Sequence, residues 1–458
     1  MKIVTIVTLL FGIASARPIL QAQTNTPGVF YVNSFNASGT HTDYDMARQG
    51  ADAYAQANPW TGSVLVLKPT VNQTCDAVPL PSLGTSGGRL GTTSIIGYGS
   101  KTSSIVKSAS CAPSSATLSH ADSPAGQLSS GIYQSFTVDS NHIDLAACEM
   151  YGMSQTTFID VACGNAAAGA DHELEFGNRD AKSVGWMDNI YIYGLTTFDS
   201  IVGGKGAVLS PVFTAGALTS VTVLNKGAQK YTATFARAQI VGPDLYTCSS
   251  IPTLLPTLDA NSFINGAKIT SAGNCTSTAH LYVLIQDGTP VTYGMKFSNM
   301  ADSQVWNLQA SSTTTYGEGW LMGSNNNLIY NEHPTSNQLV QITDNGNGNK
   351  HINPVFTSPG AYGAAIYSQN GTIQNAVFRW DSSSYVGASG YYLGNDPRVY
   401  QDWAIQNSTC GSNTTNFIAV TTVQGPVNGG NPLPPGVKPQ NIHLCDGSNT
   451  IDWPVINQ

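Results

Sequence analysis

The chain carries little charge and few of the signals that mark common functional classes. Only 10 % of its 458 residues are charged, against about 25 % in an ordinary globular domain, and the net charge is −8. No cluster concentrates the 19 Lys and Arg residues, so the composition argues against nucleic acid and anionic membranes as partners. Beyond the N-terminus, no window approaches the roughly eighteen apolar residues of a membrane-spanning helix.

The sequence also lacks the motifs that bind phosphate groups or zinc. The stretch IIGYGSKTSSIVK (95–107) has the order strand, glycines, Lys-Thr, but the two glycine positions of a phosphate loop hold Ser100 and Ile95. There is no Cys-x-x-Cys and no His at zinc spacing. We therefore predict no cofactor and no metal.

The N-terminus indicates export. Met1-Lys2 is positive, residues 3–16 are mainly apolar, and small residues occupy 14–16 and 20–22. This pattern predicts a secretory signal cleaved near Ala22, because the apolar run is short for a membrane anchor. We expect a secreted or periplasmic protein that has no membrane contact after cleavage.

Export affects how the cysteines are interpreted. Eight is an even number, and disulfides form in oxidising compartments. Pairing between sequence neighbours would close loops of modest length, although spacing alone does not determine connectivity. The expected pairs are Cys75 with Cys111, Cys148 with Cys163, Cys248 with Cys275, and Cys410 with Cys445.

The chain predicts one early helix and many short strands. DYDMARQGADAYAQAN (43–58) has a helical pattern that ends before Pro59, and SVLVL (63–67) is typical of a buried strand. After these elements, strands of four to six residues alternate with Gly, Asn and Ser turns.

A repeat in the second half indicates the architecture. An aliphatic residue, one further position and then Asn recur with separations of 24, 22, 22 and 32 residues. Units of this length are too short for a propeller blade and suit the coils of a parallel β-helix. Stacked coils lie about 4.8 Å apart, so we expect these Asn amides to hydrogen-bond to one another in a ladder. Its members are Asn307, Asn331, Asn353, Asn375 and Asn407.

The middle of the chain departs from this repeat. AGALTSVTVLNKGAQKYTAT (215–234) alternates like a hairpin strand, which predicts an inserted all-β module stapled by Cys248 and Cys275. The predicted organisation is a signal peptide at 1–22, a cap with the first coils at 23–204, the module at 205–285, further coils at 286–410 and a C-terminal cap at 411–458.

The N-terminal order resembles the start of the pectate-lyase-like superfamily of secreted right-handed parallel β-helix proteins, which includes polygalacturonase-related enzymes and phage tailspikes. An early helix, SVLVLKP (63–69) and SIIGYGSKTSSIV (94–106) carry the resemblance. It implies an all-β, right-handed parallel β-helix with an N-terminal capping helix, and polysaccharide as partner. The Asn-Thr-Asp, Asp-Asp, Gly-His-Gly and Arg-x-Lys motifs of polygalacturonases are absent, so the resemblance identifies no catalytic residue.

Candidate site residues follow from the chemistry of glycoside hydrolysis, which needs two carboxyl groups across one groove. We predict that the pair comes from Glu173, Asp188, Glu332 and Asp344, which lie in or beside predicted strands. Three of the four also have a structural interpretation: a turn residue for Asp344, a loop edge for Glu332 and a solvated strand face for Glu173. Predicted substrate-binding residues are Trp186, Tyr191, Tyr330, His333 and His351.

The preferred function is a secreted polysaccharide-degrading enzyme, either a glycoside hydrolase or a polysaccharide lyase. A non-catalytic carbohydrate-binding or tailspike-like recognition protein and a structural surface protein remain alternatives, because no family motif for catalysis is present. The sequence is compatible with a monomer or a trimer.

Overall fold

The computed structural model describes most of the chain from residue 26 onward. The described residues are 26–58, 60–75, 90–120, 129–177, 187–200, 204, 207–227, 230–233, 236–241, 247–279, 281–287, 291–310, 316–334, 340–357, 362–367, 370–379, 389–393, 404–406, 409–410, 416–420, 438–440, 442–443 and 450–451. The proposed signal peptide lies outside them.

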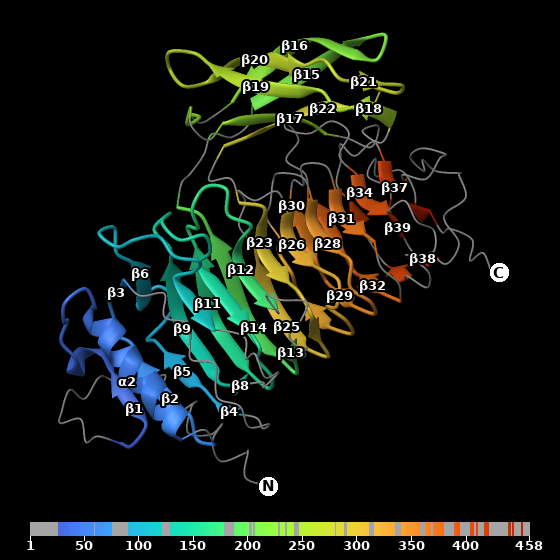
Figure 1. Cartoon of the computed structure of the whole chain (residues 1–458). Coiled ribbons are helices and arrows are strands. Elements are labelled where there is room, and N and C mark those ends of the chain that lie inside the picture. Colours follow the sequence, from blue (N-terminus) through green and yellow to red (C-terminus); the bar gives the residue numbers. More distant parts are fainter. Residues whose placement is uncertain are drawn as a thin grey trace.

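The predicted early helix is confirmed as α2 (Asp43–Ala57). It begins at a capping box in which Thr42 and Asp45 satisfy each other's backbone N–H groups. Its buried face contacts β1 (Val29–Tyr31) and β2 (Ser63–Val66), the first strands of the stack. Figure 1 shows α2 at the blue end, where it covers the first coils.

Two long parallel sheets form the body of the molecule, a right-handed parallel β-helix (Figure 1). Sheet 1 contains, in spatial order, β1, β2, β5 (Thr93–Ile96), β9 (Ile132–Asp139), β11 (Thr157–Gly164), β14 (Tyr191–Phe198), β25 (Gln304–Gln309), β27 (Leu328–Tyr330), β29 (Lys350–Ile352), β32 (Thr372–Gln374), β35 (Ala404–Gln406) and β38 (Lys438–Gln440). Sheet 2 contains β7 (Leu118–His120), β10 (Cys148–Tyr151), β12 (His172–Gly177), β23 (Tyr293–Phe297), β26 (Tyr316–Trp320), β28 (Val340–Asp344), β31 (Tyr362–Ile366), β34 (Ser389–Leu393) and β37 (Asn416–Val420).

The stack continues across the insertion. β14 pairs in parallel with β25, and β12 pairs with β23, although more than 100 residues separate the strands of each pair. The intervening chain forms a separate six-stranded antiparallel sheet with its own apolar core, which stands off one side of the coils in Figure 1. Its strands are β16 (Ala217–Lys226), β15 (Ala207–Thr214), β22 (Tyr282–Gln286), β17 (Arg237–Val241), β19 (Thr253–Leu258) and β20 (Ile264–Ser271).

The interior of the coils is filled by side chains that stack from one coil to the next. Phe176, Phe297 and Trp320 occupy equivalent positions on three neighbouring strands and are all buried. The ring centroids of Phe297 and Trp320 lie 4.0 Å apart. This stacking extends the apolar core along the helix axis.

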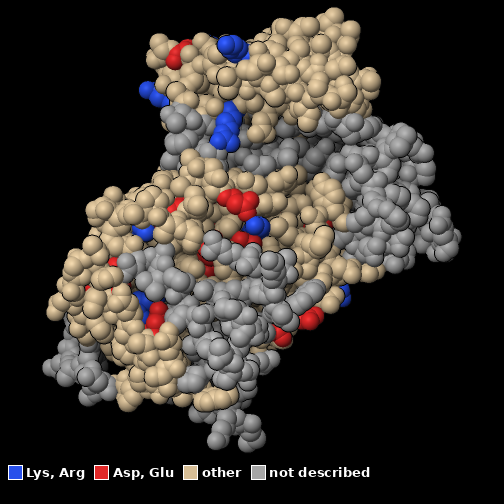
Figure 2. Space-filling view, in the orientation of Figure 1, with Lys and Arg blue, Asp and Glu red and all other residues tan. Residues whose placement is uncertain are grey.

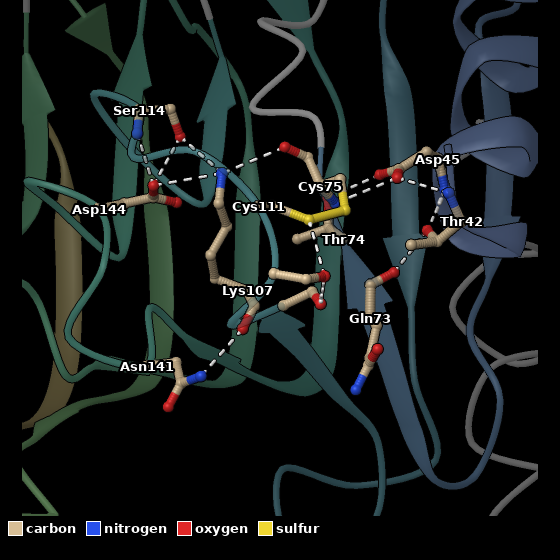
Figure 3. The surroundings of a disulfide bond; sticks show 12 residues. Thr42, Asp45, Gln73, Thr74, Cys75, Lys107, Cys111, Ser114, Asn141 and Asp144 are labelled. Carbon is tan, nitrogen blue, oxygen red and sulfur yellow. Dashed lines mark hydrogen bonds and ion pairs between the residues drawn. A yellow bond between two sulfur atoms is a disulfide. The ribbon is translucent and has the colours of Figure 1, made fainter. Parts of the chain in front are cut away.

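Three of the four predicted disulfides are confirmed. Cys75–Cys111, Cys148–Cys163 and Cys248–Cys275 are bonded. Figure 3 shows the first of them next to the buried ion pair of Lys107 and Asp144. The fourth prediction involves Cys445, which lies outside the described residues.

The predicted asparagine ladder is also confirmed for four of its five members. Asn331, Asn353 and Asn375 each donate from Nδ2 to the Oδ1 of the preceding Asn, at 3.1–3.3 Å. Each of the four has a positive φ of 56–58°, a conformation that Asn tolerates better than most residues. Asn407 lies outside the described residues. Among the described helices, none is long and apolar enough to cross a membrane.

Candidate functional site

A pocket of about 500 Å³ opens on the outer face of sheet 2. Its floor consists of side chains that stand in register on neighbouring strands. One row runs from Glu149 on β10 through Glu175 on β12 to Lys296 on β23. A second row runs from His172 on β12 through Tyr293 on β23 to Tyr316 on β26. In Figure 2, acidic and basic side chains gather near the middle of the displayed face.

Two glycines lie on the strands that carry the pocket residues. Gly177 stands in register with Tyr151, and a Cβ there would lie 2.7 Å from the carbonyl oxygen of Ser298. Gly319 continues the row of Lys296, and a Cβ there would lie 2.6 Å from the ring of Tyr293. A side chain at either position would have to displace its neighbour, so both positions require a close backbone approach.

The charged side chains of the pocket form one network. The Lys296 Nζ lies 2.6 Å from an Asp171 oxygen and 3.2 Å from a Glu175 oxygen. The His172 ring lies between three carboxylates, at 3.3 Å from Asp171, 3.6 Å from Glu175 and 3.7 Å from Glu149. The pocket therefore holds one more carboxyl group than it holds cations.

Glu175 has several donors around it in the pocket. In addition to Lys296, the Tyr151 hydroxyl donates to its Oε2 at 3.0 Å and the Ser298 hydroxyl donates to its Oε1 at 3.2 Å. Charge-assisted hydrogen bonds of this kind hold a carboxylate in a single orientation.

The network perturbs proton affinities in a consistent direction. Burial alone would lower the pKa of His172, but the surrounding carboxylates of Asp171, Glu149 and Glu175 outweigh burial and raise it to about 9. The hydrogen bond with His172, together with Lys296, holds the pKa of Asp171 well below its usual range. At neutral pH the imidazole is therefore protonated and Asp171 is ionised.

Tyrosines and apolar side chains border the charged floor. The Tyr293 and Tyr316 rings stack with centroids 4.9 Å apart, and burial raises the pKa of both phenols. Leu321 and Met322 line the same pocket, and Met322 is 83 % exposed. An apolar border beside fixed polar groups is the usual composition of a small-molecule or sugar site. Within the described residues, no group of His, Cys, Asp and Glu is arranged to hold a metal ion.

The structure brings three of the predicted residues together, but inside the coils. His351 lies 2.9 Å from a Glu332 oxygen on one ring nitrogen and 2.9 Å from an Asp344 oxygen on the other. Glu332 and His351 are 0 % exposed, and Asp344 is 1 % exposed. Glu318 and Trp320 complete this interior cluster, because the Trp320 Nε1–H donates to Glu318 at 3.4 Å.

Electrostatics keep His351 protonated despite its burial. Burial would lower the pKa of His351, but Glu332 and Asp344 raise it to about 10. Burial and the neighbouring Glu332 raise the pKa of Glu318 well above its ordinary value. Both nitrogens of His351 therefore donate to carboxylates. These contacts favour a structural role, and a catalytic or binding role for the three predicted residues stays a prediction.

The two remaining predicted acids lie apart from that cluster and from each other. Glu173 accepts a hydrogen bond from the Ala166 N–H at 2.8 Å and is 0 % exposed, so the interpretation as a solvated strand face is wrong. Burial raises its pKa to about 8. Asp188 lies on β13 (Met187–Asp188), where the Ser154 hydroxyl and the Asn189 amide donate to it.

The predicted aromatic and histidine ligands also occupy separate places. Tyr330 is the last member of an aromatic stack on the outer face of sheet 1, with its centroid 5.9 Å from that of Trp306. Tyr191 begins β14 on sheet 1, and the His333 N–H donates to the Leu308 carbonyl at 2.7 Å. Trp186 lies outside the described residues.

None of the charged and hydroxyl residues of the pocket floor was among the predicted site residues; these are Glu149, Tyr151, Asp171, His172, Glu175 and Lys296. A signal for the first two was present, because CEMY (148–151) alternates as a strand does and places Glu149 and Tyr151 on one face. A second signal was the repeated Tyr-Gly at Tyr293 and Tyr316, which marks one row of sheet 2. Nothing local to Lys296 connects it with Glu175, because the inserted module separates them.

The chain resembles several solved structures in overall shape only. No protein-family model and no curated protein matches it. ORF18 of Geobacillus virus E2 is 9 % identical with a TM-score of 0.45, over 86 % of this chain and 60 % of that one. The A-module of mannuronan C-5 epimerase AlgE6 from Azotobacter vinelandii is 13 % identical with a TM-score of 0.45, over 91 % and 94 %. PfbA, a surface adhesin of Streptococcus pneumoniae, is 11 % identical with a TM-score of 0.44, over 86 % and 82 %.

Proposed function

We propose that the protein is a secreted glycoside hydrolase that cleaves a polysaccharide in the outer-face pocket, with Glu149 and Glu175 as its carboxyl pair. One observation carries this proposal: the two glutamates stand in register on adjacent strands and line the same open pocket. The three disulfides support the secreted location, because such bonds persist in oxidising compartments.

The spacing of the pair supports a retaining mechanism. Residues in register on adjacent strands are about 4.8 Å apart, close to the roughly 5–5.5 Å between the carboxyl groups of retaining glycosidases. The His172 ring contacts both carboxylates, Glu149 from Nε2 at 3.7 Å and Glu175 from Nδ1 at 3.6 Å. We expect the anomeric configuration to be retained.

The surroundings distinguish the two roles. Glu175 accepts from Tyr151, Ser298 and Lys296, which stabilise the anion and suit a nucleophile that attacks the sugar. Glu149 is then the group that protonates the leaving oxygen and afterwards activates water. His172 orients both carboxylates, since it contacts both.

Cleavage by β-elimination is the second reaction class. A lyase would need the Lys296 and His172 cations to neutralise the carboxylate of a uronic acid, with Tyr151 as a proton carrier. Both cations already contact carboxylates of the protein, which favours hydrolysis. A recognition protein that binds sugar without cleaving it is the alternative of a different class.

The test is a screen of the purified mature protein against a polysaccharide panel, scoring both new reducing ends and the absorbance of unsaturated products. We expect reducing ends without unsaturated products. Glu149→Gln and Glu175→Gln should each lower kcat at least about 100-fold while leaving binding nearly intact. Asp302→Asn is the matched control, because it removes the charge of an exposed acid outside the pocket.

Three outcomes would contradict the proposal. Unsaturated products would indicate the lyase reaction instead. Binding without any product would favour the recognition protein. Wild-type turnover in both amide variants would place the chemistry at another site.

A further inference from the structure

Asp171 occupies a distinctive place at the mouth of the pocket. It directly precedes β12, and its side chain is 53 % exposed, whereas those of Glu149 and Glu175 are 8 % and 9 % exposed. A single oxygen of Asp171 lies 2.6 Å from the Lys296 Nζ and 3.3 Å from the His172 Nδ1. One carboxylate oxygen therefore bridges the two cations of the pocket from the solvent side.

A bound uronic acid would place its carboxylate in the same kind of position. A lysine beside a protonated imidazole is a favourable anion site, since both donate charge-assisted hydrogen bonds. Here Asp171 already accepts those bonds, and Glu175 lies near the same two cations at 3.2 Å and 3.6 Å. A further carboxylate would meet two anions and no unoccupied cation, and like charges at such distances repel.

We propose that Asp171 is the specificity-determining residue of the pocket: it fills the anion site formed by Lys296 and His172, and so restricts the pocket to sugars without a carboxylate there. This inference rests on the proposed function, in that the pocket is the place where a polysaccharide binds. It identifies the substrate class as a neutral glycan and describes an anion site that the protein itself occupies.

The position of Asp171 makes the idea testable by substitution. Its backbone carbonyl accepts from the Tyr293 N–H at 2.8 Å, a bond that does not depend on the side chain. Because the side chain is half exposed and precedes the strand, its removal leaves the register of β12 unchanged. Asp171→Ala removes charge and shape together, whereas Asp171→Asn removes the charge and keeps the shape.

The experiment measures binding of two probes, trigalacturonate and a neutral galactotriose, to the full mature protein by calorimetry. We expect the wild type to favour the neutral probe. Asp171→Ala should shift the ratio of the two Kd values at least about tenfold towards trigalacturonate, and added salt should reduce this gain. Asp171→Asn should show the same direction. Asp302→Asn, which changes the net charge equally, should leave the ratio as in the wild type.

A second measurement separates this inference from the proposed function. Acetate is titrated while the His172 ring is followed by NMR, in the wild type and in Asp171→Ala. Acetate should perturb the ring in the variant only, whether or not any polysaccharide is cleaved. Preference of the wild type for trigalacturonate, or an unchanged ratio and no acetate response in Asp171→Ala, would overturn the role of Asp171 even if hydrolysis is observed. An acetate response without any cleavage would support the role of Asp171 and contradict the proposed hydrolase function.

Discussion

The protein contains two clusters in which a histidine lies among carboxylates, and they differ in the side of the sheet that they occupy. In the pocket, His172 contacts Glu149, Asp171 and Glu175 on the outer face of sheet 2. In the interior, His351 contacts Glu332 and Asp344 with no exposure to solvent. Residue type and proximity are similar in both, so chemistry alone does not tell a site from a core.

The difference shows that access decides what such a cluster can do. The pocket is open to solvent, so a substrate can enter it. The interior cluster is buried, and the contacts of His351 with Glu332 and Asp344 join neighbouring coils. Burial makes the interior charges strongly dependent on their partners, because an unpaired charge in a dry interior is costly.

The largest expected effect comes from breaking the interior cluster. His351→Ala leaves the Glu332 and Asp344 carboxyl groups buried without their cation, which should lower the free energy of unfolding by about 3–5 kcal/mol. Urea denaturation of the purified protein measures this loss. His172→Ala should cost less, since the pocket is open to water and Lys296 remains beside the carboxylates. Equal losses in the two variants would remove the distinction between the clusters.

The next effect uses Glu173, which lies on the same strand as His172 and Glu175 but is fully buried. Its pKa is raised from 4.5 to about 8, so the folded protein binds a proton that the unfolded chain has lost between these pH values. The stability from this group is present below about pH 4.5 and falls as pH rises towards 8, by about 1.4 kcal/mol per pH unit.

Glu173→Gln should abolish the part of the pH-dependent fall in stability that is due to Glu173. Thermal unfolding between pH 4.5 and 8 measures this decline. The stability of the variant relative to the wild type should increase as pH rises. The decline in stability due to His351 should remain in the variant. The pKa of His351 is raised from 6.5 to about 10, so its contribution to stability is lost progressively as pH rises above 6.5. Parallel pH profiles for the variant and the wild type would show that Glu173 is ionised in the folded protein.

The smallest expected loss of stability concerns the asparagine ladder, whose side chains are hydrogen-bonded but exposed. Asn331 donates to Asn307 and accepts from Asn353 in the ladder, and its φ is 56°. Asn331→Ala loses both hydrogen bonds and pays for the left-handed backbone, for an expected loss of about 1–2 kcal/mol. Asn331→Gly should cost about 1 kcal/mol less than Asn331→Ala, because glycine adopts this backbone freely. Chemical denaturation compares the two, and equal losses would show that the amides alone matter.

Much of the fold was predictable from local patterns. The capping helix shows its start at Thr42 and its end before Pro59, and the asparagine spacing equals the length of a coil. Cysteine neighbours gave the three confirmed pairs, because short loops bring sequence neighbours together. These features depend on residues that lie near one another along the chain.

The candidate site was less predictable. Of the predicted acids, Glu332 and Asp344 do converge on His351, yet they point into the coils. Glu173 precedes Glu175 by two positions in an alternating stretch, which predicts that both share one face, but Glu173 is paired with no residue of β23 and lies inside. Strict alternation of facing between Glu173 and Glu175 therefore does not hold along β12.

By itself, the sequence determined the repeat, the early helix, the turn asparagines and the cysteine neighbours, because each depends on propensities and spacings within about one coil. Only the tertiary structure decided which acids face solvent, and it placed Lys296 beside Glu175 across the inserted module. The physical reason is that inward and outward facing depend on strand register between coils. Register is established by packing along the whole stack, and a shift of one residue exchanges the two faces.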